Sequence, residues 1–119
     1  MKISKIRDLL ITEYGTCFLG GNISRKNPYT GHHIKPVRDG GETTIRNIAL
    51  LGRLQHDMHN VIEKDNYIEG KMLNEYYTYY KQTKDGLALM QMKRYIENEI
   101  RKRGYTVEDR GKILTLKRR

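Results

Sequence analysis

The pattern of apolar and polar positions predicts an amphipathic helix near the start of the chain. Apolar residues recur three to four positions apart over residues 4–14, which is the spacing of one helix face. Gly15 follows, and glycine commonly ends helices. The short apolar run at residues 16–19 predicts a strand, after which a polar loop continues to Thr30.

The next segment predicts two strands joined by a turn. Strands are predicted over residues 32–37 and 47–51, and an Asp-Gly-Gly sequence marks a turn over residues 38–42. A connection this short joins antiparallel strands, because parallel strands need a longer crossover.

A helix is predicted directly afterwards, over residues 53–65. Its apolar residues lie at offsets of four, seven and eight from Leu54 and share one face. Polar residues three to four positions apart share the other face. The apolar face comprises Leu54, Met58, Val61 and Ile62, and the polar face comprises His56, His59, Asn60 and Glu63. The unit as a whole is strand, turn, strand, helix.

The second half of the chain predicts a helical extension over about residues 70–103. Asp85-Gly86 interrupts it, and Asp85 is expected to cap the second of two helices. That helix should end before Gly104. The remaining residues predict a small β-hairpin, with strands at residues 105–107 and 113–116, and a basic tail at residues 117–119.

Tyrosines in the first of these helices allow two interpretations. They either form the core face of the helix, the more frequent case, or stack on the bases of an unpaired nucleic-acid strand. The residues concerned are Tyr76, Tyr77, Tyr79 and Tyr80.

Charge gives the first indication of a partner. The chain of 119 residues has 23 Lys and Arg against 14 Asp and Glu, a net charge of +9. A basic surface attracts polyanions, although the same charge also serves solubility, and charge alone does not decide between the two.

Cysteine content and hydropathy exclude several classes of protein. Cys17 is the only cysteine, so an intramolecular disulfide and a four-cysteine zinc ribbon are both excluded. The chain has neither a signal-peptide pattern nor an apolar stretch of membrane-spanning length. We expect a soluble, cytoplasmic protein with no membrane partner.

All four histidines fall within or beside the strand–turn–strand–helix unit. His56 and His59 share one side of the predicted helix, and His32 and His33 are adjacent on the first strand. Neutral imidazole is a common ligand of transition metals. Because adjacent strand residues face opposite ways, His32 and His33 should have different tasks, one as a metal ligand and the other as a general base. A lone histidine is more often structural, but the clustering argues against that interpretation here.

The pattern around these histidines resembles the HNH endonuclease family. The matching features are Gly-His-His-Ile-Lys-Pro from Gly31, Gly40-Gly41, Asn47, Leu50-Leu51 and the helix residue His56. The resemblance implies an α+β fold built on a ββα-metal module, with residues 1–119 as a single nuclease domain. The core motif would cover about residues 31–65.

The resemblance also implies roles for individual residues. His32 and His56 would bind one divalent ion, His33 would be the general base, and Asn47 would hold the loop between the strands. A further ligand remains open between His59, Asn60 and water, with His59 our choice. No second, structural zinc site is expected, because Gly52 and Gln55 stand where many members have cysteines.

The implied activity is hydrolysis of phosphodiester bonds in DNA, expected to be double-stranded. The ion would be magnesium, manganese, nickel or zinc, and an imidazole-rich ligand set disfavours magnesium. A double-strand cut by a one-domain nuclease often requires a homodimer, although the sequence shows no interface. In its compactness the chain resembles HNH proteins that phages and mobile elements encode. Four basic residues flank the site as candidate phosphate contacts: Lys35, Arg38, Arg46 and Arg53.

An alternative is a non-catalytic module that binds nucleic acid or protein through the nuclease scaffold. The presence of both His32 and His33 favours the enzyme, since a decayed nuclease could lose its base. A structural zinc protein is less favoured, because such a site uses four ligands.

Overall fold

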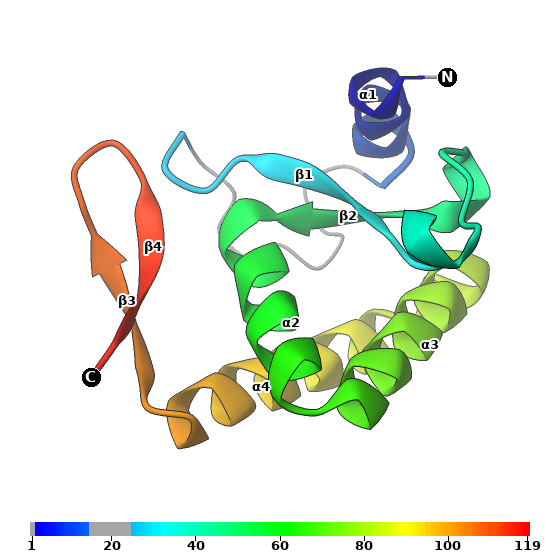
Figure 1. Ribbon diagram of the computed structural model, residues 1–119. Coiled ribbons are helices and arrows are strands. Elements are labelled where there is room, and N and C mark those ends of the chain that lie inside the picture. Colours follow the sequence, from blue (N-terminus) through cyan, green and yellow to red (C-terminus); the bar gives the residue numbers. More distant parts are fainter. Residues whose placement is uncertain (1, 15–24) are drawn as a thin grey trace.

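The computed structural model describes residues 2–14 and 25–119, and within them the fold is mixed α and β (Figure 1). The strand predicted over residues 16–19 lies outside the described residues. The helices and strands follow in the order α1 (Ile3–Tyr14), β1 (Tyr29–His33), β2 (Ile48–Gly52), α2 (Arg53–Asp65), α3 (Tyr67–Thr83), α4 (Gly86–Lys102), β3 (Tyr105–Asp109) and β4 (Leu114–Arg118). The predicted α+β class and its ββα unit are confirmed.

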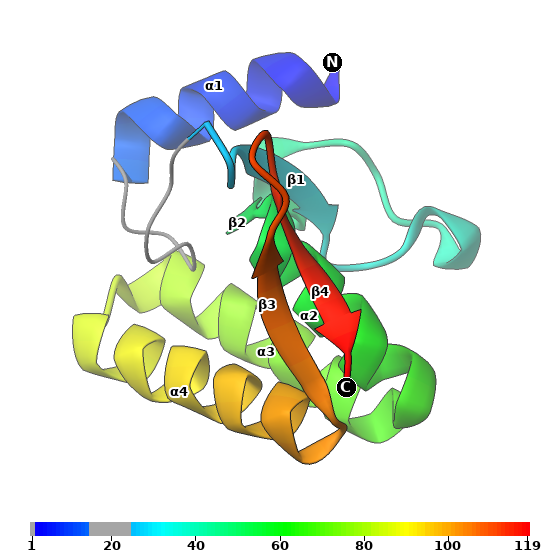
Figure 2. The ribbon, with the colours of Figure 1, turned by 90° about the vertical axis from the view of Figure 1, so that its left-hand side faces the viewer.

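The β1–β2 hairpin lies between helices on both of its faces. The strands are antiparallel, with His32 opposite Ala49 and His33 opposite Ile48. Helix α1 covers one face of the hairpin, and α2 and α3 lie on the other (Figures 1 and 2). All five residues of β2 are buried, as expected of a strand that is covered on both faces.

The predicted bounds of the first strand were wrong. Strand β1 begins at Tyr29, whose side chain is buried, and ends at His33. Beyond His33 the ladder gives way to contacts with a single residue: Ile34 N–H donates to the Asn47 backbone carbonyl, and Lys35 N–H donates to the Asn47 side chain. Pro36 follows and has no N–H to donate.

The connection between the strands is also more structured than the predicted turn. It contains two short 3-10 helices, Val37–Asp39 and Ile45–Asn47, so β2 starts at Ile48 instead of residue 47. Gly40 follows the first of them, and its φ of 85° is in the left-handed region that favours glycine.

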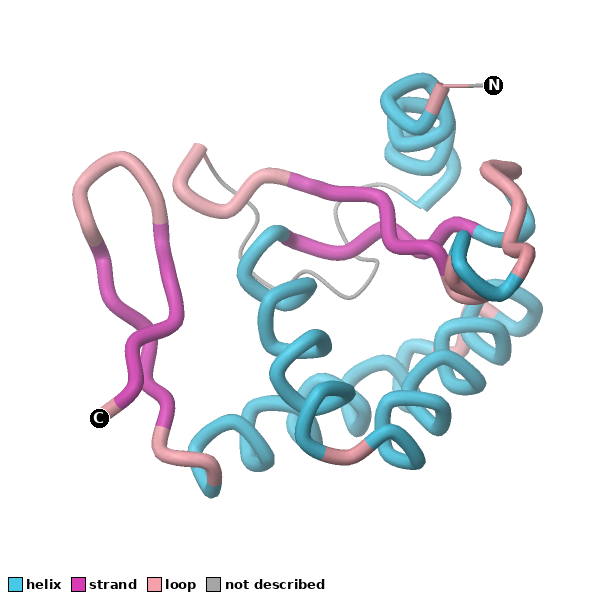
Figure 3. Tube along the Cα trace, in the orientation of Figure 1, coloured by secondary structure: helices cyan, strands magenta, loops and turns pink. Residues whose placement is uncertain are grey.

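The helical extension comprises two helices that pack with α2 (Figure 3). Asp85 caps α4 by accepting from the N–H groups of Leu87 and Ala88, as predicted. Arg103, just after α4, forms ion pairs with Asp65 at the end of α2 and with Glu69 in α3. No helix among residues 2–14 and 25–119 is long and apolar enough to cross a membrane.

The face of α2 that was predicted to be polar is not polar throughout. His59 was placed on that face, but its side chain is fully buried. It fits the core because protein partners satisfy both of its ring nitrogens, as described below. His56 is partly exposed and Asn60 is exposed, as expected of a polar face.

The tyrosines of α3 divide between core and surface. Tyr77 and Tyr80 are buried, which confirms the core interpretation for them. Tyr76 and Tyr79 remain exposed, three residues apart on the same helix.

The C-terminal hairpin is confirmed, with longer strands than predicted. Strands β3 and β4 are antiparallel, with Val107 opposite Leu116. Lys117 and Arg118, predicted to lie in a basic tail, belong to β4. The hairpin packs beside α4 through β3 and beside α2 through β4.

Gly41, in the loop between β1 and β2, should tolerate substitution much less well than Gly86 at the start of α4. A Cβ at Gly41 would lie 1.8 Å from the backbone oxygen of Lys35, whereas a Cβ at Gly86 would meet nothing within 4 Å. We expect Gly41→Ala to lower the free energy of unfolding by at least about 2 kcal/mol. Gly86→Ala, the matched control, should be neutral or stabilising by up to about 1 kcal/mol. Urea unfolding of both variants measures this, and equal stabilities would contradict the loop geometry.

Candidate active site

Strand β1 and helix α2 bring three histidine rings together. The ring centroid of His32 lies 5.0 Å from that of His56 and 4.3 Å from that of His59. The grouping follows from chain geometry, because α2 begins at Arg53, directly after β2. The first turns of the helix therefore lie beside β1, the partner strand of β2.

The hydrogen bonds of Thr30 determine which nitrogen of His56 carries the hydrogen. The Thr30 hydroxyl donates to the backbone oxygen of Leu51 at 2.9 Å, and the hydroxyl oxygen of Thr30 lies 3.0 Å from His56 Nδ1. A hydroxyl has only one hydrogen, so Thr30 accepts from His56 Nδ1–H. In the neutral ring His56 Nε2 then carries a lone pair.

That lone pair faces His32. His56 Nε2 lies 3.2 Å from His32 Nδ1. Two imidazole nitrogens bound to one tetrahedral ion, each about 2.0–2.1 Å away, are roughly 3.3 Å apart. The spacing and the donor type therefore fit a single transition-metal ion held by these two side chains.

Burial keeps these rings neutral and so available as ligands. The pKa of His32 is lowered from 6.5 to about 3. Desolvation by burial is the largest cause, and the neighbouring His59 is the next largest. Desolvation likewise lowers the pKa of His56, again with a contribution from His59. Neutral imidazole is the form that binds metal.

His59 uses both of its nitrogens for protein contacts. Nε2 lies 3.0 Å from a Glu63 carboxylate oxygen, and Nδ1 lies 2.8 Å from the Tyr77 hydroxyl. Desolvation lowers the pKa of His59, and burial raises the pKa of Tyr77. A neutral His59 therefore donates to the carboxylate from Nε2 and accepts the phenol hydrogen at Nδ1.

His33 lies at the end of the same strand and contacts a different residue. Its Nε2 is 3.0 Å from the hydroxyl oxygen of Thr43, in the loop between the strands. His33 also contributes electrostatically to the lowered pKa values of His32 and His56. It is thus close to both rings without a direct contact to either among the described interactions.

Asn47 holds the loop that carries these residues. Its side-chain oxygen accepts from Lys35 N–H at 2.8 Å, and its amide nitrogen donates to the backbone oxygens of Lys35 and Glu42 at 3.0 and 2.8 Å. One side chain therefore fixes both sides of the loop, close to the position where β1 ends at His33.

Comparison with known proteins gives the family. The HNH endonuclease family model matches residues 16–61, the segment that contains β1, β2 and most of α2. Residues 16–61 are a domain of the HNH endonuclease family. Members of this family are typically hydrolytic nucleases that use one divalent metal ion. Neither a curated protein nor a solved structure matches the chain, so the assignment depends on this match and on the fold.

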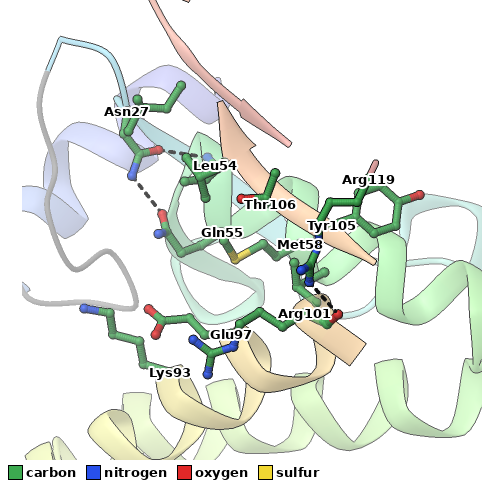
Figure 4. A pocket seen from close by; sticks show the side chains of 13 residues that line it. Asn27, Leu54, Gln55, Met58, Lys93, Glu97, Arg101, Tyr105, Thr106 and Arg119 are labelled. Atoms are coloured by element: carbon green, nitrogen blue, oxygen red, sulfur yellow. Dashed lines mark hydrogen bonds between the residues drawn. The ribbon is translucent and has the colours of Figure 1, made fainter. Parts of the chain in front are cut away.

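The start of the HNH helix is held by a residue from another segment. Gly52 precedes α2 and has no side chain to cap it. Asn27 supplies the contact instead: its oxygen accepts from Leu54 N–H, and its amide donates to the side chain of Gln55 (Figure 4). All three side chains are buried, and they line a hollow on the side of α2 that faces α4 and the C-terminal hairpin.

The four basic residues expected near the HNH site differ in their surroundings. Lys35 and Arg46 are exposed, and Arg38 pairs with Glu63 at 3.5 Å. Arg53 is partly buried, and its Nη1 is buried with no hydrogen-bond partner among the described residues. Arg53 is three residues before His56 on α2, so the two side chains lie on the same side of the helix.

Several contacts of the HNH histidines were missed by the sequence interpretation. Thr30 had a usable signal, because it is two residues before His32 and so on the same face of β1. Thr43, Asn74 and Tyr77 had none. They come from a loop and from α3, and only the tertiary fold brings them to the histidines. Within the described residues, no group of three or more His, Cys, Asp or Glu side chains is arranged to hold a metal ion.

The lowered pKa of His32 predicts a specific pH dependence of stability for the metal-free protein. Below pH 6.5 the unfolded chain binds a proton at His32, whereas the folded chain does so only near pH 3. The contribution of His32 to the free energy of unfolding is therefore fully present well above pH 6.5 and is lost as the pH falls below it. Between pH 7.5 and 5 the loss for this residue alone is about 2 kcal/mol.

Urea unfolding in EDTA, repeated from pH 7.5 to 5, measures this loss. His32→Gln should show a shallower dependence by about one proton. A wild type of constant stability over this range would contradict the burial of neutral imidazoles.

Proposed function

We propose that this chain is a metal-dependent endonuclease that hydrolyses phosphodiester bonds of double-stranded DNA with one divalent ion. The observation that carries the proposal is the pair of ring nitrogens, His32 Nδ1 and His56 Nε2, facing each other at 3.2 Å. Family membership of residues 16–61 supports the same reaction class.

The proposed ligands are His32 and His56, with the remaining positions filled by water or phosphate oxygen. Two imidazoles favour zinc or nickel over magnesium and manganese, which prefer oxygen ligands. His59 as a third ligand stays a prediction. Its lone pair now accepts from Tyr77, so His59 could bind the ion only if that hydroxyl turned away. Water is therefore the preferred choice for the open position.

A bound divalent ion supplies a Lewis acid that stabilises negative charge on the phosphate and the leaving oxygen. His33 is the proposed general base. Its Nε2 is engaged by Thr43, which leaves Nδ1 to take a proton from the attacking water. Asn47 is a positioning residue, because its three hydrogen bonds fix the loop next to the base.

Basic residues around the ion are proposed to bind the DNA backbone. Arg53 is the best supported, since it precedes His56 by about one turn of α2 and its Nη1 has no hydrogen-bond partner among the described residues. Exposed Lys35 and Arg46 can reach neighbouring phosphates. Arg38 would first have to leave Glu63, so we expect it to contribute less.

We further propose that residues 1–119 act as one nuclease domain. Helices α3 and α4 and strand β4 all pack on α2, and Arg103 links the ends of three helices. A single site of this kind cuts one strand at a time, so linear product from a plasmid would require two molecules, as in a homodimer.

Plasmid cleavage tests the proposal. Purified protein should relax or linearise supercoiled plasmid with manganese, nickel or zinc, and EDTA should stop the reaction. His33→Ala should lower the rate by about 10²–10⁴-fold, the usual contribution of a general base, while plasmid binding and the melting temperature remain close to wild type.

Gln82→Ala, at an exposed position on α3, is the matched control and should cleave like wild type. If no metal supports cleavage, yet the protein binds plasmid tightly and in a salt-sensitive manner, the non-catalytic binding module is correct instead. Full activity in His33→Ala would disprove the assignment of the base.

A further inference from the structure

Helix α3 contributes a residue to the histidine cluster from outside the matched HNH segment. His32 Nε2 lies 2.8 Å from the side-chain oxygen of Asn74. Asn74 belongs to α3, beyond residues 16–61. The position of this helix is fixed by Leu73 and Tyr77, which flank Asn74 and are fully buried.

This contact determines where His32 carries its hydrogen. The amide oxygen can only accept a hydrogen bond, so His32 Nε2 is the nitrogen that bears the hydrogen. A neutral imidazole has one N–H, which leaves a lone pair on Nδ1. That lone pair points toward His56 Nε2, at 3.2 Å.

The arrangement is symmetrical about the proposed ion site. Thr30 accepts from the outer nitrogen of His56, and Asn74 accepts from the outer nitrogen of His32. Both inner nitrogens are then left as lone pairs. Two facing lone pairs repel each other unless a cation lies between them, so the two acceptors prepare the pair to bind a cation.

We propose that Asn74 is a positioning residue that holds His32 in its metal-binding tautomer, so that α3 is part of the metal centre. The inference rests on the proposed role of His32 as a ligand. Partners of this kind on the outer nitrogen of a ligand histidine usually contribute 10–100-fold to metal affinity.

The opposite orientation of the amide would have a different consequence. If the Asn74 NH₂ group donated to His32 Nε2, the hydrogen of His32 would be on Nδ1 and would donate to His56 Nε2. The two rings would then be joined by a hydrogen bond, and neither inner nitrogen would be ready for an ion. Asn74→Asp separates the two cases, because a carboxylate accepts and cannot donate.

Histidine ¹⁵N NMR of the metal-free protein at pH 8 tests the tautomer directly. We expect the hydrogen of His32 on Nε2 in the wild type and in Asn74→Asp. Asn74→Leu, which removes the acceptor at similar size, should move the hydrogen of His32 to Nδ1, where it can donate to His56 Nε2. A wild-type His32 with its hydrogen on Nδ1 would overturn the proposal, and this spectrum decides even if a variant fails to fold.

Calorimetric titration with Zn²⁺ tests the consequence. Asn74→Leu should bind Zn²⁺ about 10–100-fold more weakly than wild type, and Asn74→Asp should bind it equally well or more tightly. Asn98→Leu makes the same change at an exposed position on α4 and should have no effect. Unchanged affinity in Asn74→Leu, or a loss in Asn74→Asp equal to that in Asn74→Leu, would refute the role of Asn74.

A parallel cleavage assay separates this inference from the proposed function. A wild type that shows the expected tautomer and binds Zn²⁺, but cuts no DNA with any metal, disproves the nuclease and leaves the role of Asn74 intact. A wild type that cuts DNA while Asn74→Leu binds Zn²⁺ normally disproves the role of Asn74 alone.

Discussion

The candidate site depends on one interaction, the pair of ring nitrogens of His32 and His56 that face each other between β1 and α2. Each imidazole can present a lone pair inward only if its outer nitrogen has an acceptor, and only if burial keeps the ring neutral. Thr30 and Asn74 are the acceptors, and desolvation of His32 and His56 provides the neutrality.

The order and pairing of β1, β2 and α2 place His32 and His56 side by side. Antiparallel pairing of β1 and β2 fixes His32 opposite Ala49, and the helix follows β2 without a loop. Asn27 holds the N-terminus of that helix from a separate segment. The first turn of α2 therefore has little freedom, and His56 is held against β1 by backbone geometry as much as by its own hydrogen bonds.

The fold could largely be predicted because its signals are local. Helical periodicity gave the bounds of α2 correctly, and Asp85 indicated the start of α4 through its capping chemistry. The bounds of β1 were missed because pairing, and not composition, decides where a strand ends: Tyr29 lies in a stretch that resembles a loop, and the side chain of Asn47 replaces the ladder beyond His33.

The candidate site was predictable only in part, for the same physical reason. His32, His33, Asn47 and His56 follow a motif that can be read along the chain. The environment of His59 cannot be read in this way, because its burial depends on Tyr77 of another helix. Asn74 likewise reaches His32 across 42 residues of sequence, and no local pattern indicates such a contact.

The central claim is that His32 and His56 together hold the ion, and anomalous diffraction from a crystal of the protein grown with Zn²⁺ tests it most directly. The account predicts one strong anomalous peak between His32 Nδ1 and His56 Nε2, with His59 still bonded to Tyr77 and Glu63. A peak bound through His32 Nε2, or one that lies away from both residues, would contradict it.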